Sequence, residues 1–196
     1  MMITNRHDNN PNDNMNRNGN AIHDEAALWD KCIAFHGHEC GGLLIGFKAA
    51  LYAIELLGIR FSSDEQLVCI SENDACGVDA IQVILGCSIG KGNLLFKLRG
   101  KQAYTFYNRR TGDAFRLLLR SAAPPEGTDK LSYMIGHSAV ELFEVQPARE
   151  ELPERARIFQ SYPCSVCGEM TAEAHLRLRD GAKICLDCDT PYRRFR

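Results

Sequence analysis

The chain has 196 residues, of which 45% are hydrophobic and 24% are charged, and its formal net charge is −2 at pH 7. These values are typical of a folded globular protein with one core of moderate size, and they exclude a fibrous or wholly disordered chain. A charge so close to neutral gives no reason to expect general attraction to nucleic acid or to an anionic membrane surface. Binding partners must therefore be inferred from individual sites.

The N-terminal segment differs from the rest in composition. Its first twenty residues contain eight Asn and few large apolar side chains. Because so little apolar surface cannot offset the entropy of ordering, residues 1–22 are expected to form a disordered tail.

No secretory leader is recognisable, and the longest apolar run, residues 43–57, is interrupted by Lys48 and Glu55. We therefore expect no membrane segment and a cytoplasmic location, where nine cysteines favour metal or thiol chemistry over disulfides.

Helices and strands are predicted in a mixed order after this tail, from apolar periodicity and glycine stops. Gly58 and Gly86 suit the positions just past two helix ends, and Gly46 is expected to permit close approach of a neighbouring element. The predicted helices cover residues 24–32, 43–57, 76–85 and 130–139. The predicted strands cover residues 67–70, 93–98, 102–108, 115–120 and 141–145.

This mixture of elements predicts an α+β domain with a mixed sheet. Residues 93–98 and 102–108 are expected to pair as a β-hairpin, while a helix remains the alternative to a strand at 115–120. The segment 150–157 is charged and contains a proline, which is typical of a linker. The expected organisation is thus a core domain at 23–150 and a linker with a small module at 151–196.

Four cysteines of the C-terminal module form two CxxC pairs, CSVC and CLDC, with seventeen residues between them. Each tight turn places two sulfurs on one ion, so the spacing predicts a tetrahedral four-thiolate zinc site. A module of roughly forty residues has little core of its own, so the metal is expected to supply much of its folding free energy. The predicted ligands are Cys164, Cys167, Cys185 and Cys188.

The charge of this module bears on its partner. Between Glu150 and Arg196 there are eight basic and eight acidic side chains. Phosphate binding normally needs a basic excess, so this balance disfavours nucleic acid as a partner.

A second group of metal-binding residue types lies in the core domain, where His36, His38 and Cys40 fall within five residues before a predicted helix. A thiol at a helix N-terminus has a stabilised thiolate, which makes Cys40 a candidate nucleophile, redox thiol or metal ligand. Imidazoles beside it are usual companions in zinc or iron sites, and a surface loop with incidental histidines is the alternative.

Cys76 and Cys87 flank a further predicted helix, and the glycine-rich turns next to them are expected to keep both near the surface. Cys32 and Cys69 fit small core residues.

Four ordered segments stand out beside the cysteine pairs. They read FHGHECGGLLIG, ENDACGVDAIQVILGCSIGKGNL, GKQAYTFYNRRTGDAFR and ELFEV. Together they resemble the FmdE family, named after the FmdE component of formylmethanofuran dehydrogenase. The resemblance implies a thioredoxin-like core with a mixed sheet flanked by helices, followed by a treble-clef zinc finger.

The resemblance also implies a His/Cys pocket that holds a metal and serves as the active site, so a second zinc or another transition metal is expected in the core. Carried over residue by residue, its members are His36, His38, Cys40, Cys76, Asp79, Gln82, Cys87 and Lys91.

Three functions are compatible with these groups. The first is an accessory or redox-linked metalloprotein of anaerobic one-carbon or molybdenum/tungsten enzyme metabolism, with a homodimer and a molybdenum or tungsten enzyme as expected partners. The second is an enzyme in which Cys40 or metal-bound water is the nucleophile, His36 or His38 the base and Lys91 an anion-binding group, although no substrate or activity follows from the residues. The third is a metal- or redox-responsive regulator or adaptor that uses the zinc finger.

Overall fold

The computed structural model describes residues 21–59, 61–120, 124 and 126–195. It divides the chain into two compact units, one ending at Arg155 and the other beginning at Ala156. We expected a disordered tail at residues 1–22. Residues 1–20 lie outside the described residues, and the first helix begins at Ala21. None of the helices in the described part of the chain is long and apolar enough to span a membrane.

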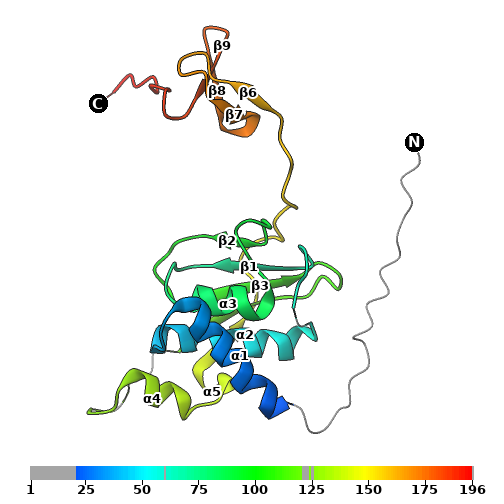
Figure 1. Cartoon of the computed structure of the whole chain (residues 1–196), viewed down its shortest axis with the longest axis vertical. Coiled ribbons are helices and arrows are strands. Elements are labelled where there is room, and N and C mark those ends of the chain that lie inside the picture. Colours follow the sequence, from blue (N-terminus) through cyan, green and yellow to red (C-terminus); the bar gives the residue numbers. More distant parts are fainter. Residues whose placement is uncertain (1–20, 60, 121–123, 125, 196) are drawn as a thin grey trace, which may run out of the picture. The chain divides into compact units, whose positions relative to one another are not determined.

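The first unit is an α+β domain in which Figure 1 shows the helices gathered on one side of a sheet. Its helices over the described residues are α1 (Ala21–His36), α2 (Gly41–Leu57), α3 (Gly77–Leu85), α4 (Lys130–Ile135) and α5 (Ala139–Leu142). Its strands are β1 (Leu67–Ser71), β2 (Leu94–Phe96), β3 (Ala103–Asn108), β4 (Ala114–Leu119) and β5 (Phe143–Gln146). The predicted mixed sheet flanked by helices is confirmed, and the thioredoxin-like assignment stays a prediction.

The strand order of this sheet corrects one prediction. Over the described residues the order is β2-β1-β3-β4-β5, with β2 parallel to β1 and the remaining pairs antiparallel. The hairpin expected between residues 93–98 and 102–108 is therefore wrong, because β1 lies between them. β1 is buried at every position, and a strand buried on both faces needs ladder partners along both edges. The turn around Gly100 carries the chain across the end of β1.

A second correction concerns the helix predicted over residues 130–139. The structure has two short helices instead, with α4 ending at Gly136 and α5 beginning after Ser138. The Ser138 hydroxyl accepts from the Glu141 N–H at 3.4 Å, and the Glu141 carboxylate accepts from the Ser138 N–H at 2.7 Å. This reciprocal pair is a capping box, which starts a new helix. The strand predicted at 141–145 consequently begins two residues later, at Phe143.

The close crossing of α2 and α3 fixes the position of both helices. A Cβ added at Gly46 would lie 1.9 Å from the Gly77 carbonyl oxygen, and one added at Gly77 would lie 3.0 Å from the Gly46 nitrogen. The two backbones are therefore in direct contact, as Gly46 led us to expect. α2 also ends as predicted, with Gly58 at φ 60° donating its N–H to the Ile54 carbonyl.

We predict that Gly46→Ala destabilises the protein by about 3 kcal/mol or more, since backbone on both sides of the crossing cannot repack as a side chain does. Urea unfolding measures this change. Gly90→Ala is the matched control, because a Cβ there meets no atom within 4 Å, and its effect should stay within about 0.5 kcal/mol. Equal stability of the two variants would contradict the close crossing.

The face of the sheet opposite the helices carries a smaller apolar cluster of Val68, Ile70 and Tyr107. Residues 147–155, which we call the strap, cover it: Ala148 packs against the cluster, and the Tyr107 hydroxyl donates to the Glu150 carbonyl at 2.8 Å. The Arg109 guanidinium donates to the strap carbonyls of Pro153 and Glu154 at 2.7 and 3.1 Å. Residues up to Arg155 thus belong to the core, five beyond the expected boundary.

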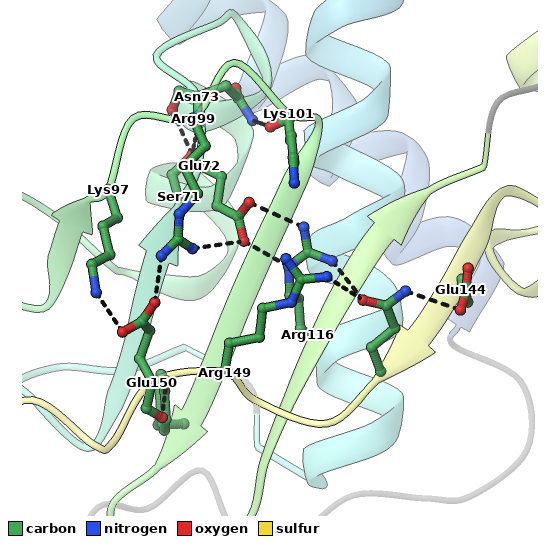
Figure 2. Close-up of polar contacts among 12 residues, drawn as sticks. Ser71, Glu72, Asn73, Lys97, Arg99, Lys101, Arg116, Glu144, Arg149 and Glu150 are labelled. Atoms are coloured by element: carbon green, nitrogen blue, oxygen red, sulfur yellow. Dashed lines mark hydrogen bonds and ion pairs between the residues drawn. The ribbon is translucent and has the colours of Figure 1, made fainter.

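Buried charge ties the strap to the sheet (Figure 2). Arg116 is fully buried and donates from Nε and Nη2 to the Glu72 carboxylate at 2.6 and 3.0 Å. This bidentate contact lowers the pKa of Glu72. Arg99 lies 3.5 Å from Glu72 and also donates to the strap residue Glu150 at 2.6 Å, where Lys97 is a further partner. The buried Arg116–Glu72 pair is costly to break at one partner, and Arg99 links it to Glu150 of the strap through a more exposed contact.

We predict that a chain ending after Arg155 unfolds cooperatively, whereas one ending after Gln146 melts at least about 6 °C lower, because it loses the hydrogen bonds to the strap. Thermal melts over a hundredfold range of concentration separate this effect from loss of a dimer contact. Equal melting temperatures would contradict the strap's role. A concentration-independent failure of the longer chain to fold would contradict the boundary.

Candidate metal centres

The core site forms where three helix ends meet. His36 is the last residue of α1, Cys40 is the N-cap of α2, and Cys76 is the N-cap of α3. Among the described residues, one ring nitrogen of His36 and the two sulfurs lie within 4.8 Å of one another, and all three residues are half-buried. Residues about forty positions apart in sequence therefore converge, as the sequence led us to expect for His36, Cys40 and Cys76.

The two cysteines pack closely against the backbone of α2 at Gly42. A Cβ added at Gly42 would lie 3.2 Å from the Cys76 Cβ and 3.7 Å from the Cys40 sulfur. The Leu43 N–H donates to the Cys40 sulfur at 3.3 Å, which caps α2. The Cys76 side chain makes no capping hydrogen bond, and its sulfur lies beside that of Cys40.

His36 is oriented by a carboxylate. Its Nδ1 lies 2.7 Å from an Asp79 oxygen, and its Nε2 faces the Cys40 sulfur at 3.9 Å. The second Asp79 oxygen accepts from Gln82 at 3.3 Å. The contact with Asp79 raises the pKa of His36, with burial opposing it. A carboxylate–histidine pair that presents Nε2 to a site is the usual support of a metal-ligating imidazole.

The two thiols differ in acidity. Burial by itself raises the pKa of Cys40, but hydrogen bonds from the Leu43 N–H, Cys76 and the Gly42 N–H outweigh burial and lower it. The pKa of Cys76 is raised, first by burial and then by Cys40. Cys40 is thus the group that forms a thiolate more readily.

The donor set fits a transition metal such as zinc. Tetrahedral bonds of about 2.0–2.3 Å place ligand atoms roughly 3.5–3.8 Å apart, so donor atoms that lie within 4.8 Å of one another need a contraction of at most about 1 Å. His36, Cys40 and Cys76 would hold the ion, which would act there as a Lewis acid.

The other predicted members of the pocket lie outside this ligand cluster. His38 is exposed and stacks on His36 with ring centroids 4.6 Å apart. Lys91 donates to the Ser62 carbonyl at 2.9 Å. This contact lies beyond the C-terminal end of α3, whereas Cys76 lies at the N-terminal end, and the helix between them is roughly 13 Å long. The structure therefore does not bring Lys91 to the cluster.

Cys87 is fully buried, and the expectation that it lies near the surface is wrong. Its sulfur donates to the Leu67 carbonyl at 3.8 Å, and burial raises its pKa to about 12. Cys32 and Cys69 are fully buried, which confirms them as core residues.

One residue near the site was not found from the sequence. The Lys130 Cγ would lie 3.4 Å from a Cβ added at Gly41, the residue next to Cys40. No sequence signal relates these positions, because α4 reaches the start of α2 only through tertiary packing.

The second centre lies in the C-terminal unit, where β6 (Ser161–Pro163) pairs with β7 (Met170–Ala172). After a 3-10 turn, Glu173–His175, β8 (Leu176–Arg179) pairs with β9 (Ala182–Cys185). The sulfurs of Cys164, Cys167, Cys185 and Cys188 lie within 4.8 Å of one another. The treble-clef arrangement of these elements stays a prediction.

Backbone donors prepare the first cysteine of this centre as a thiolate. The Cys185 and Val166 N–H groups point at the Cys164 sulfur at 3.3 and 3.4 Å. These hydrogen bonds, of which the one from Cys185 has the largest effect, lower the pKa of Cys164 to about 6. Within the described residues of this unit, Cys164 and Cys185 are the only buried side chains, so a metal is what can hold the unit together.

Comparison with known proteins assigns both regions. A family model described as "FmdE, Molybdenum formylmethanofuran dehydrogenase operon" matches residues 35–161, and the chain belongs to the FmdE family. A model described as "Prokaryotic dksA/traR C4-type zinc finger" matches residues 157–194. The protein is thus an FmdE-like protein with a zinc-binding finger at its C-terminus.

Two known proteins are similar to this chain. A crystal structure of a tungsten formylmethanofuran dehydrogenase FmdE-like protein from Syntrophus aciditrophicus superposes with a TM-score of 0.62 and 21% identity, over 84% of this chain and 91% of the other. This likeness shows the fold. A protein of Archaeoglobus fulgidus named "Probable S-adenosyl-L-methionine-binding protein" is 28% identical over 81% of this chain and 51% of its own length. The chain spans about half the length of that relative.

We predict that Cys185→Ser removes the finger's zinc and makes the unit after Ala156 sensitive to protease, because its fold depends on the ion. Zinc analysis and limited proteolysis measure both effects. Leu186→Ser is the matched control, because it alters the next side chain, which is exposed, and spares the ligands. Full zinc retention in Cys185→Ser would overturn the assignment.

Proposed function

We propose that this FmdE-family protein binds a second metal ion in its core, and that it acts as an accessory or redox-linked protein of anaerobic one-carbon or molybdenum/tungsten enzyme metabolism. The observation that carries the core site is the convergence of His36, Cys40 and Cys76 within 4.8 Å. The sulfur-rich donor set favours zinc or another thiophilic transition metal.

An accessory role is supported by the metal ligands of the site and by the position of Lys91 away from it. The described residues around the two thiols provide metal ligands and an oriented imidazole, and Lys91, the proposed anion-binding group, is engaged elsewhere by Ser62. The family model's description places relatives in a formylmethanofuran dehydrogenase operon. A homodimer and a molybdenum or tungsten enzyme are the partners of this proposal.

A second candidate is an adaptor that docks through the finger. The observation in its favour is that large apolar side chains of this small unit are strongly exposed, among them Ile158, Leu178, Tyr192 and Phe195. Exposed apolar surface of this kind favours a protein partner. The unit from Ala156 carries seven basic and five acidic side chains, an excess too small to favour nucleic acid.

The test of the core metal is stoichiometry under anaerobic conditions. Wild-type protein should hold about two zinc ions per chain and Cys40→Ser about one, since the finger keeps its own. Cys32→Ser is the control variant, because Cys32 is buried in the core and is not among the converging donors. Equal zinc content of wild type and Cys40→Ser would overturn the proposal.

Loss of the orienting carboxylate should weaken the same site. We predict that Asp79→Asn lowers the affinity of the core for zinc by about 10- to 100-fold and leaves the finger unchanged. Competition with a chromophoric chelator measures both affinities. Asp74→Asn, an exposed acid in the segment before α3, should change neither, and an unchanged core affinity in Asp79→Asn would contradict the role of Asp79.

A further inference from the structure

We infer that the core metal site binds an exogenous small-molecule thiol that carries an anionic tail, with its sulfur in the fourth ligand position and its tail against Lys130. This inference rests on the proposed function, because it requires a metal held by His36, Cys40 and Cys76.

The first step is the number of protein ligands. Three donor atoms converge among the described residues, whereas structural zinc sites such as the finger close with four. His38 does not supply the fourth donor, because its exposed ring stacks on His36 outside the cluster. Asp79 is not among the converging donors either, and its two oxygens contact His36 and Gln82. Sites with three protein ligands keep a position for an external one.

The second step is the chemistry of that external ligand. Two thiolates and an imidazole make a soft donor set, which suits sulfur better than a carboxylate oxygen. The N-terminal ends of α2 and α3 both face the cluster through their caps Cys40 and Cys76. Positive helix ends and a metal stabilise an additional thiolate, whose proton is released to solvent on binding.

The third step is the tail of the ligand. Lys130 is exposed and lies against Gly41, next to Cys40, with its Cγ 3.4 Å from the position of an added Cβ. The Lys130 ammonium is three bonds beyond the Cγ that lies against Gly41, the first residue of α2. The acids of this edge accept hydrogen bonds from other groups: Asp79 contacts His36, Glu39 accepts from the Trp29 indole, and Asp129 accepts from the Leu131 and Ser132 N–H groups. Lys130 can therefore pair with an anionic tail.

The test uses the full chain loaded with cobalt(II), whose visible spectrum reports a change of ligand. Three probes of matched size are titrated anaerobically: 3-mercaptopropionate, its neutral methyl ester, and propionate. Both thiols should change the spectrum saturably, the acid should bind about two- to fivefold tighter than the ester, and propionate should have no effect. Lys130→Ala should remove the preference for the acid and leave the ester unchanged, while Lys101→Ala, another exposed lysine, keeps it.

The possible failures are distinguishable. Cobalt content equal to that of Cys40→Ser means that the core holds no metal, which overturns the proposed function. Two cobalt ions per chain with no response to either thiol, or an equal response to propionate, overturns the thiol ligand alone. A changed spectrum of His38→Ala without any added ligand identifies His38 as the fourth donor and also overturns it. Equal affinity of wild type for acid and ester overturns the role of Lys130.

Discussion

The backbone contact between Gly46 of α2 and Gly77 of α3 determines where the two N-terminal cysteines stand. Cys76 directly precedes Gly77, and Cys40 lies less than two helical turns before Gly46, so a crossing at this point brings both helix starts together. Tyr104 of β3 presses on the same place, since its hydroxyl would lie 2.5 Å from a Cβ on Gly77. The site thus depends on the contact of two helices with each other and with the sheet.

The core unit and the finger differ in how far their folding depends on a metal ion. The core unit has a continuous apolar cluster and a buried Arg116–Glu72 pair, so its fold does not need an ion. The finger buries little besides Cys164 and Cys185 within its described residues, so its fold and its metal are coupled. Exchange of the proposed core metal, or of its external ligand, would therefore not require unfolding.

Local sequence signals were sufficient for part of this description. The CxxC spacing identified the finger, Gly58 and Gly86 marked helix ends, and Gly46 indicated a close approach, because each signal reflects chemistry within one short segment. Signals failed where the outcome depended on partners far along the chain. The parallel pairing of β2 with β1, the burial of Cys87 and the position of Lys130 against Gly41 all follow from tertiary packing. The capping box at Ser138 was a local signal that the apolar pattern obscured.

The central claim is that the α2–α3 crossing assembles a sulfur-rich metal site that contains one histidine. Zinc-edge X-ray absorption of the anaerobically purified chain tests it most directly, because the finger alone gives four sulfurs per zinc and no imidazole. With both sites filled and water as the fourth core ligand, the average should be about three sulfurs and one nitrogen or oxygen per zinc, with the outer-shell scattering of an imidazole from His36. A spectrum of four sulfurs without imidazole would contradict the account.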